Sequence, residues 1–266
     1  MLRKYLPLGL KIARPYMNVL RAAKKHNKKG KRTYEEYFFY QQKMIRKAFD
    51  RGLKIDFRIT GEENLPHDTN YLLVSNHQSN LDPVIFLATS KKPLAFITKK
   101  ENYDFALLKP ILEASVCVPM DRNNLRSEVK TMMETEKIMK EKKLSFCIYP
   151  EGTRSREDEH PVHEFKPGAL KPAYRCQVPI VPVAVYGTFR ALDKKFIMKG
   201  YPIQMHILKP IDPSEYASTP TTVMAKRLEE EIRAEVGKEK EEDRKLMEAK
   251  KKDIRTRKLP IYFKGI

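Results

Sequence analysis

The sequence predicts an α/β protein with a mostly parallel sheet flanked by helices, preceded by a basic amphipathic helical segment at the N-terminus. Short apolar runs of strand length alternate with helical patterns along the middle of the chain, which favours parallel strands joined by helices. The positive charge is concentrated at the start, because residues 1–54 hold 16 Lys or Arg against 3 Asp or Glu. A net charge of +19 for the whole chain favours an anionic partner, whether nucleic acid, an acidic bilayer or a phosphorylated substrate.

The N-terminal segment, residues 1–51, is expected to be helical and to dock on a membrane. On a helix over residues 2–25 the basic side chains fall within about 100° of arc, opposite an apolar face. These basic residues are Lys4, Lys11, Arg14, Arg21 and Lys25. Pro15 predicts a kink or two shorter helices, and a second helix is expected from Thr33 to about Arg51. Alternatively, the apolar face of the first helix packs on the protein core.

Residues 52–220 are expected to form the main α/β domain, and 221–266 a charged C-terminal helix and tail. The periodicities predict strands at 53–60, 71–75, 94–98, 115–119, 144–149, 180–186 and 203–208. They predict helices at 81–90, 104–113, 124–142 and 168–175. Residues 221–258 are mostly charged, with spaced Leu, Ile, Val and Met, which indicates a solvated helix with no direct role in function.

No stretch reaches the roughly 18 uncharged apolar residues that a spanning helix needs. Basic residues at 11, 14 and 21 also interrupt the apolar region of any signal peptide. If this protein works on lipid, it is expected to lie at the cytoplasmic side of a membrane, as a peripheral or monotopic protein without a transmembrane span. Its three cysteines, in apolar contexts and without CxxC spacing, are expected to be buried free thiols.

The first informative stretch is NHQSNLD, residues 76–82, which directly follows an apolar strand candidate. Polar groups at the carboxyl end of a strand in an α/β sheet lie where ligands usually bind. On one ideal helix His77 and Asp82 would point about 140° apart, so they meet only if the chain turns between them. An Asp that holds one imidazole nitrogen leaves the other free as a general base. The alternative is a packed, structural histidine.

The second stretch is YPEGTRSR, residues 149–156, which follows another apolar strand candidate. Gly152 permits close backbone approach, and Thr153 and Ser155 offer hydroxyls. Arg154 and Arg156 can hold phosphate oxygens in bidentate fashion. The alternative is a turn with exposed arginines.

Together the two stretches resemble the glycerolipid acyltransferase family of the lysophosphatidate acyltransferase type. That family carries an NHxxxxD block, here 76–82, and an FPEGTRS block, here 149–155 with Tyr149 in place of Phe. Residues 115–122 and 178–183 resemble two further blocks, with Ser115 in place of the usual Gly and Met120 in place of Ile. The resemblance covers roughly residues 55–210.

The resemblance implies roles for several residues. His77 would deprotonate the free hydroxyl of a lysophosphatidic acid acceptor, held in its tautomer by Asp82, and the alkoxide would attack an acyl thioester directly. Glu151, Gly152 and Thr153 would lie in the acceptor-binding loop. A cationic pocket for the acceptor's phosphate would be formed by Lys99, Arg122 and Arg154. The acyl donor would be acyl-CoA or acyl-carrier protein, with no metal and no bound cofactor.

Several other functions are compatible with parts of the sequence. A related acyltransferase would use glycerol-3-phosphate or another lysophospholipid. A basic nucleic-acid-binding protein would explain the charge, but no zinc-finger, RNP or KH signature is present, so no nucleic-acid partner is expected. A non-catalytic lipid-binding protein would not need His77 and Asp82. The HPVHE stretch at 160–164 lacks HExxH spacing, and a serine nucleophile at Ser75 or Ser79 would lack a GxSxG elbow.

Overall fold

A mostly parallel sheet lies at the centre of the computed structural model, which describes residues 2–29, 33–50, 56–155, 161–192 and 202–255. In the described residues its strands have the order β1-β7-β6-β2-β5-β3-β4. The strands are β1 (Asp56–Thr60), β2 (Leu72–Ser75), β3 (Leu94–Lys99), β4 (Val118–Met120), β5 (Ser145–Ile148), β6 (Ile180–Tyr186) and β7 (Pro202–Ile207). Within this sheet only β6 and β7 pair antiparallel. The predicted fold class is confirmed.

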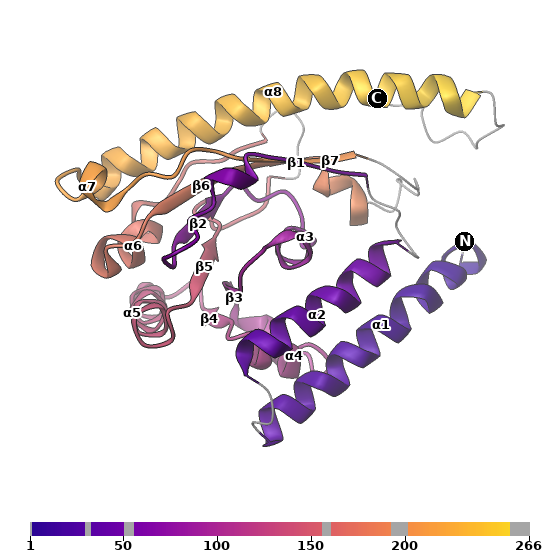
Figure 1. Ribbon diagram of the computed structural model, residues 1–266, viewed down its shortest axis with the longest axis horizontal. Coiled ribbons are helices and arrows are strands. Elements are labelled where there is room, and N and C mark those ends of the chain that lie inside the picture. The colour runs from indigo at the N-terminus through magenta and orange to yellow at the C-terminus, as the bar shows by residue number, and fades with distance from the viewer. Residues whose placement is uncertain (1, 30–32, 51–55, 156–160, 193–201, 256–266) are drawn as a thin grey trace.

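Helices cover both faces of this sheet (Figure 1). The α-helices are α1 (Leu2–Lys29), α2 (Tyr34–Ala48), α3 (Asp82–Thr89), α4 (Lys109–Ala114), α5 (Leu125–Lys142), α6 (Lys171–Cys176), α7 (Pro213–Tyr216) and α8 (Thr221–Arg255). Short 3-10 helices are η2 (Glu62–Asn64), η3 (Lys100–Asp104), η4 (Pro167–Leu170) and η5 (Thr188–Leu192). The start of α2 carries a capping box, in which the side chains of Thr33 and Glu36 each accept from the other's backbone N–H.

The central strands are buried on both faces, which explains their uninterrupted apolar runs. Successive side chains of a strand point to opposite faces. Accordingly, Leu72 and Val74 of β2 pack in the cluster under α5, α6 and α8. Leu73 packs in the cluster under α2 and α3. Both clusters use every second residue of the same strand, so the sheet is held from two sides.

The first helix continues through Pro15, so the predicted division into two shorter helices is wrong. It lies beside α2 and α4 (Figure 1), and this packing stabilises the turn that a proline weakens. A separate cluster joins the three helices and contains Val19, Leu20, Ala23, Tyr37, Met44, Ile111 and Ala114. Part of the apolar face of α1 therefore packs on other helices of the protein. Gly52 and the start of the strand predicted at 53–60 lie outside the described residues.

The prediction that the charged C-terminal helix is solvated is wrong for one of its faces. Four apolar residues of α8 recur at intervals of four and are at most 1% exposed: Met224, Leu228, Ile232 and Val236. They belong to the main core cluster and pack α8 against β6. A helix with so few apolar residues can still be anchored, because they all fall on one stripe. Residues 256–258 lie outside the described part of the chain.

Candidate active site

Four neighbouring parallel strands bring the two sequence blocks to one edge of the sheet. The strands β4, β3, β5 and β2 lie side by side in the sheet, and their carboxyl ends lead into Arg122, Lys99, the 149–154 loop and His77. The carboxyl edge of such a sheet is where ligands of α/β proteins bind. The fold therefore gathers side chains that are up to 77 positions apart in sequence.

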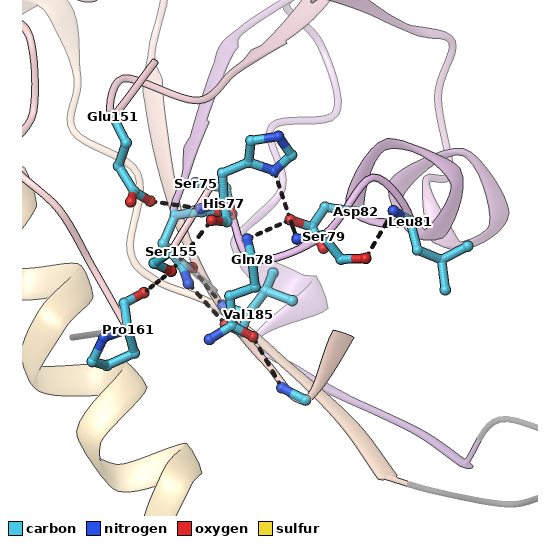
Figure 2. A network of polar contacts seen from close by, with 12 residues as sticks. Ser75, His77, Gln78, Ser79, Leu81, Asp82, Glu151, Ser155, Pro161 and Val185 are labelled. Atoms are coloured by element: carbon cyan, nitrogen blue, oxygen red, sulfur yellow. Dashed lines mark hydrogen bonds and ion pairs between the residues drawn. The ribbon is translucent and has the colours of Figure 1, made fainter. Parts of the chain in front are cut away.

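The chain turns between His77 and Asp82 as the spacing requires. Asp82 is the first residue of α3, and its Oδ2 lies 2.7 Å from His77 Nδ1. Figure 2 shows the other ring nitrogen of His77 pointing away from Asp82. When Nδ1–H donates to the carboxylate, Nε2 carries a lone pair and can accept a proton. The geometry is that of an oriented general base.

Asp82 is fixed by more than the imidazole. It is fully buried, and its Oδ2 also accepts from the backbone N–H groups of Gln78 at 2.7 Å and Ser79 at 2.9 Å. Its position in the first turn of α3 favours a negative charge. These bonds hold the carboxylate aimed at His77.

Two buried amides anchor the turn that carries His77. Asn76 exchanges two hydrogen bonds of 2.9 Å with the backbone of Val185 at the end of β6. Gln78 Oε1 accepts from the backbone N–H of Gly187 at 3.1 Å. Sequence reasoning assigned no role to either amide. The available signal is that polar side chains follow an apolar strand directly, where buried polar groups need partners.

Glu151 binds the backbone of the site instead of facing open space. It is 5% exposed, and its carboxylate accepts from the N–H of His77 at 2.6 Å and of His163 at 2.9 Å. Burial raises the pKa of Glu151 to about 8, and the two N–H groups oppose that rise. Each carboxylate oxygen of Glu151 therefore already accepts a hydrogen bond from the protein backbone. A residue that binds an acceptor directly would instead have an oxygen available for it.

Ser155 ties the second block to the first. Its backbone N–H donates to the carbonyl of His77 at 2.8 Å, and its hydroxyl donates to the carbonyl of Pro161 at 2.7 Å (Figure 2). Gly152 has a φ of 66°, a left-handed conformation that suits glycine. Thr153 is exposed, and Arg156 and His160 lie outside the described residues.

Two guanidinium groups share one region beside this loop. The side chain of Arg122 donates to the carbonyl of Gly152. Burial lowers the pKa of Arg122, and the nearby charge of Arg154 lowers it further. Lys99 lies farther out, with its Nζ 3.1 Å from Glu101. The charges of Arg122 and Arg154 therefore interact, and the two side chains form an arginine pair beside the 149–154 loop.

An apolar pocket of about 260 Å³ opens next to Arg122. Its lining includes Ile97, Met120, Met132, Ile148, Tyr149 and Ala169, and Arg122 stands at its rim. Two ion pairs join α5 to the opposite wall, Lys166 with Glu128 at 3.8 Å and Arg175 with Glu136 at 3.3 Å. Sequence reasoning missed this pocket, because its lining is drawn from strands and helices far apart in the chain.

In the part of the chain that the structure describes, the remaining sequence candidates do not form a second site. Cys147 is buried, and burial raises the pKa of Cys117 to about 12, which suits packing thiols and not nucleophiles. Within the described ranges, no group of three or more His, Cys, Asp or Glu is arranged to hold a metal ion. Among these same residues, no helix combines the length and apolar character that crossing a bilayer requires.

Comparison with known proteins gives a consistent result. Residues 56–186 match the Acyltransferase family. A probable 1-acyl-sn-glycerol-3-phosphate acyltransferase of Mycoplasma pneumoniae is 35% identical over 195 residues, which cover 68% of this chain and 71% of that protein. The 1-acyl-sn-glycerol-3-phosphate acyltransferase of Borreliella burgdorferi is 31% identical over 60% of this chain and 63% of its own length.

A solved structure shares the fold. The 1-acyl-sn-glycerophosphate (LPA) acyltransferase PlsC from Thermotoga maritima superposes with a TM-score of 0.69 at 25% identity, covering 89% of this chain and 96% of that one. The sheet, the His77–Asp82 pair at its carboxyl edge and these matches define an acyltransferase. Within that class, the chain belongs to the 1-acyl-sn-glycerol-3-phosphate acyltransferase family.

Proposed function

We propose that this protein transfers an acyl chain from acyl-CoA or acyl-carrier protein to the free hydroxyl of 1-acylglycerol-3-phosphate, giving phosphatidic acid. The observation that carries the proposal is the 2.7 Å contact of His77 with Asp82 beside the Arg122–Arg154 region. A base, an anion-binding region and an apolar pocket are the three features that a phosphorylated acceptor and a fatty thioester require.

In the proposed reaction, Nε2 of His77 takes the proton of the acceptor hydroxyl. The oxygen attacks the carbonyl carbon of the thioester and forms a tetrahedral intermediate. That intermediate collapses with cleavage of the carbon–sulfur bond, and the departing thiolate receives the proton held by His77. Asp82 stabilises the imidazolium between these two steps through its hydrogen bond with Nδ1. No covalent acyl-enzyme and no bound cofactor is needed.

The acceptor's phosphate is assigned to Arg122 and Arg154, with Lys99 as an outer cation. Arg122 is partly buried and adjoins the loop that is bound to His77. A phosphate placed there would relieve the repulsion between the two guanidiniums. Lys99 already pairs with Glu101, so its contribution would be weaker. Thr153 is exposed on the same loop as Arg154.

The acyl chain of the donor is assigned to the apolar pocket beside α5. Tyr149 forms part of its wall and stacks on His77 with ring centroids 4.1 Å apart. A chain in this pocket would therefore end next to the base. Flexible Met120, Met132 and Met133 in the lining suit a long, adaptable alkyl ligand.

The protein is proposed to reach its acceptor by lying on the cytoplasmic face of an anionic membrane. Among the described side chains of α1, Arg14, Arg21, Lys24, Lys25 and Lys28 are all exposed. Basic residues near an anionic surface contribute about 1 kcal/mol each. A long-chain lysophospholipid resides in the bilayer, so the active site must come to that surface.

The test is an acyl-transfer assay with the purified full chain. Lysophosphatidic acid, other lysophospholipids and glycerol-3-phosphate are offered with either donor, and His77→Ala serves as the inactive control. The proposal expects phosphatidic acid as the main product. Preferred acylation of glycerol-3-phosphate or of a lysophospholipid without the phosphomonoester would overturn the assignment of the acceptor. Absence of transfer from both donors would overturn the activity itself.

A further inference from the structure

The ring of Tyr149 lies flat against the imidazole of His77. Their centroids are 4.1 Å apart and their planes differ by 19°. The sheet creates this contact, because β2 and β5 are parallel neighbours with Val74 opposite Ile148. His77 and Tyr149 follow these strands directly and so leave the sheet side by side.

Asp82 controls only one edge of the imidazole. Its bond to Nδ1 fixes a point in the ring plane but leaves the ring able to tilt about that bond. A second contact on the ring's face removes this freedom. General-base transfer depends on hydrogen-bond reach between the base and the proton, and an error of about 1 Å in such positioning costs on the order of 100-fold in rate. The stacked ring supplies the missing constraint.

We propose that Tyr149 is a positioning residue for His77, whose stacked ring holds Nε2 toward the acceptor hydroxyl and supports the positive charge on the imidazole during proton transfer. An aromatic face attracts a cation placed over it, and His77 becomes a cation only after it has taken the proton. The contact therefore strengthens during the reaction. This inference rests on the proposed function, since that function includes the proton transfer.

Tyr149 is itself held in place and shared between two parts of the site. Phe86 of α3 packs on it with centroids 6.4 Å apart at 53°. The same ring lines the apolar pocket. The ring of Tyr149 thus lies between the imidazole of His77 and the pocket assigned to the acyl chain.

The kinetic test compares Tyr149→Leu with Tyr149→Phe. Leucine is apolar but has no ring, so kcat should fall by about 10-fold, equivalent to ~1.4 kcal/mol, while KM for the acceptor changes by less than about twofold. Phenylalanine keeps the ring and should retain kcat. As a control, Phe146→Leu removes a fully buried ring of β5 away from His77. It should lower thermal stability while leaving kcat nearly unchanged.

A spectroscopic test does not depend on catalysis. A ring stacked at this distance shields the imidazole carbon-bound protons, so their NMR signals should lie upfield and move downfield in Tyr149→Leu but not in Tyr149→Phe. Unchanged kcat in folded Tyr149→Leu, or a loss shared equally by Tyr149→Phe, would overturn the inference. If the wild type transfers no acyl group, the proposed function fails, and an absent upfield shift would separately refute the stack.

Discussion

At the scale of single residues, the site depends on the different roles of two neighbouring carboxylates. Asp82 accepts from the imidazole of His77, whereas Glu151 accepts from the backbone N–H of the same residue. The first orients the ring and the second orients the loop. Because the two acids act on different parts of His77, their substitutions should have different effects.

The first prediction concerns the base. His77→Ala should lower the rate of acyl transfer by at least ~10²-fold, because a positioned general base is lost. Asp82→Asn should also be severe, since the imidazole tautomer would no longer be fixed. It should additionally lower stability, because Asp82 accepts charge-assisted hydrogen bonds from Gln78 and Ser79. Initial rates and thermal unfolding of both variants give the comparison. Near wild-type turnover in folded His77→Ala would rule the mechanism out.

The second prediction concerns the acceptor's phosphate. Arg154→Ala should raise KM for a phosphate-bearing acceptor by about 10-fold and leave KM for the donor nearly unchanged, as one lost charge-assisted contact implies. Arg154→Lys should rescue only partly, because an ammonium cannot form the bidentate contact. Arg126→Ala, at an exposed arginine near the start of α5, is the matched control. An effect confined to the donor would place Arg154 on the thioester side.

At the scale of secondary-structure elements, strands were predicted well where local pattern and burial agree. The run at 180–186 coincides with β6, and 71–75 contains β2. Both runs are apolar, and each is bounded by residues that interrupt a strand: Pro179 and Gly187 in the first case, Asn70 and Asn76 in the second. The helix expected at 104–113 is reduced to α4 at Lys109–Ala114. The first part of the predicted helix is instead the end of η3 followed by a turn. The local sequence, which includes Phe105 and Pro110, does not reveal this turn.

Contacts between distant segments could not be predicted from the sequence. The spacing showed that His77 and Asp82 could meet only if the chain turned between them, and the structure contains that turn. Nothing local shows that Glu151 would reach the backbone of His163, or that α8 would bury Leu228 against the sheet. Such features depend on the order of strands in the sheet. Periodicity does not encode that order.

The third prediction concerns membrane binding by α1. Reversing four exposed charges, Arg21, Lys24, Lys25 and Lys28 to Glu, should weaken binding to anionic vesicles by at least ~10²-fold at low salt. Added salt should shrink the difference. Vesicle co-sedimentation measures it. Substitution is preferable to removal of residues 1–51, because α2 buries Tyr37 and Phe38 in the protein.

The control for this experiment reverses four exposed lysines of α5, namely Lys130, Lys137, Lys140 and Lys142. The change in net charge is identical, but the lysines lie on a different helix. If both variants lose binding equally, total charge and not α1 is responsible. If the α1 variant binds as well as the wild type, another surface docks on the membrane.

At the scale of the whole molecule, the long α8 closes the fold by covering the β6 side of the sheet along its length (Figure 1). It also carries buried charges. Arg190 pairs with Asp243 at 2.5 Å, and both are nearly fully buried. Glu239 nearby is 6% exposed. Burial, together with the charges of Glu235 and Glu242, raises the pKa of Glu239 to about 9.

The fourth prediction follows from Glu239. Its ordinary pKa is 4.5, so the unfolded chain releases this proton at lower pH than the folded protein does. The folded state therefore loses stability relative to the unfolded state as pH rises from about 4.5 to about 9. Glu239→Gln removes this loss and should be at least ~1 kcal/mol more stable than the wild type at pH 8, with no such gain at pH 4.

Urea unfolding at the two pH values measures this difference. Glu248→Gln, at an exposed position farther along the same helix, is the control and should show little change, because Glu248 is not among the charges that raise the pKa of Glu239. An equal gain for Glu239→Gln at pH 4 and pH 8 would mean that packing, and not ionisation, sets the effect.

The turn at residues 76–82 has a structural function that does not depend on the reaction. Asn76 and Gln78 bind the end of β6 whether or not His77 performs chemistry. The segment therefore serves folding through its amides and, in the proposed function, turnover through its imidazole. A relative that had lost its activity would be free to replace His77, yet would still be constrained to keep the amides on either side. Retention of the surrounding motif thus attests to the architecture, and only the imidazole itself attests to the reaction.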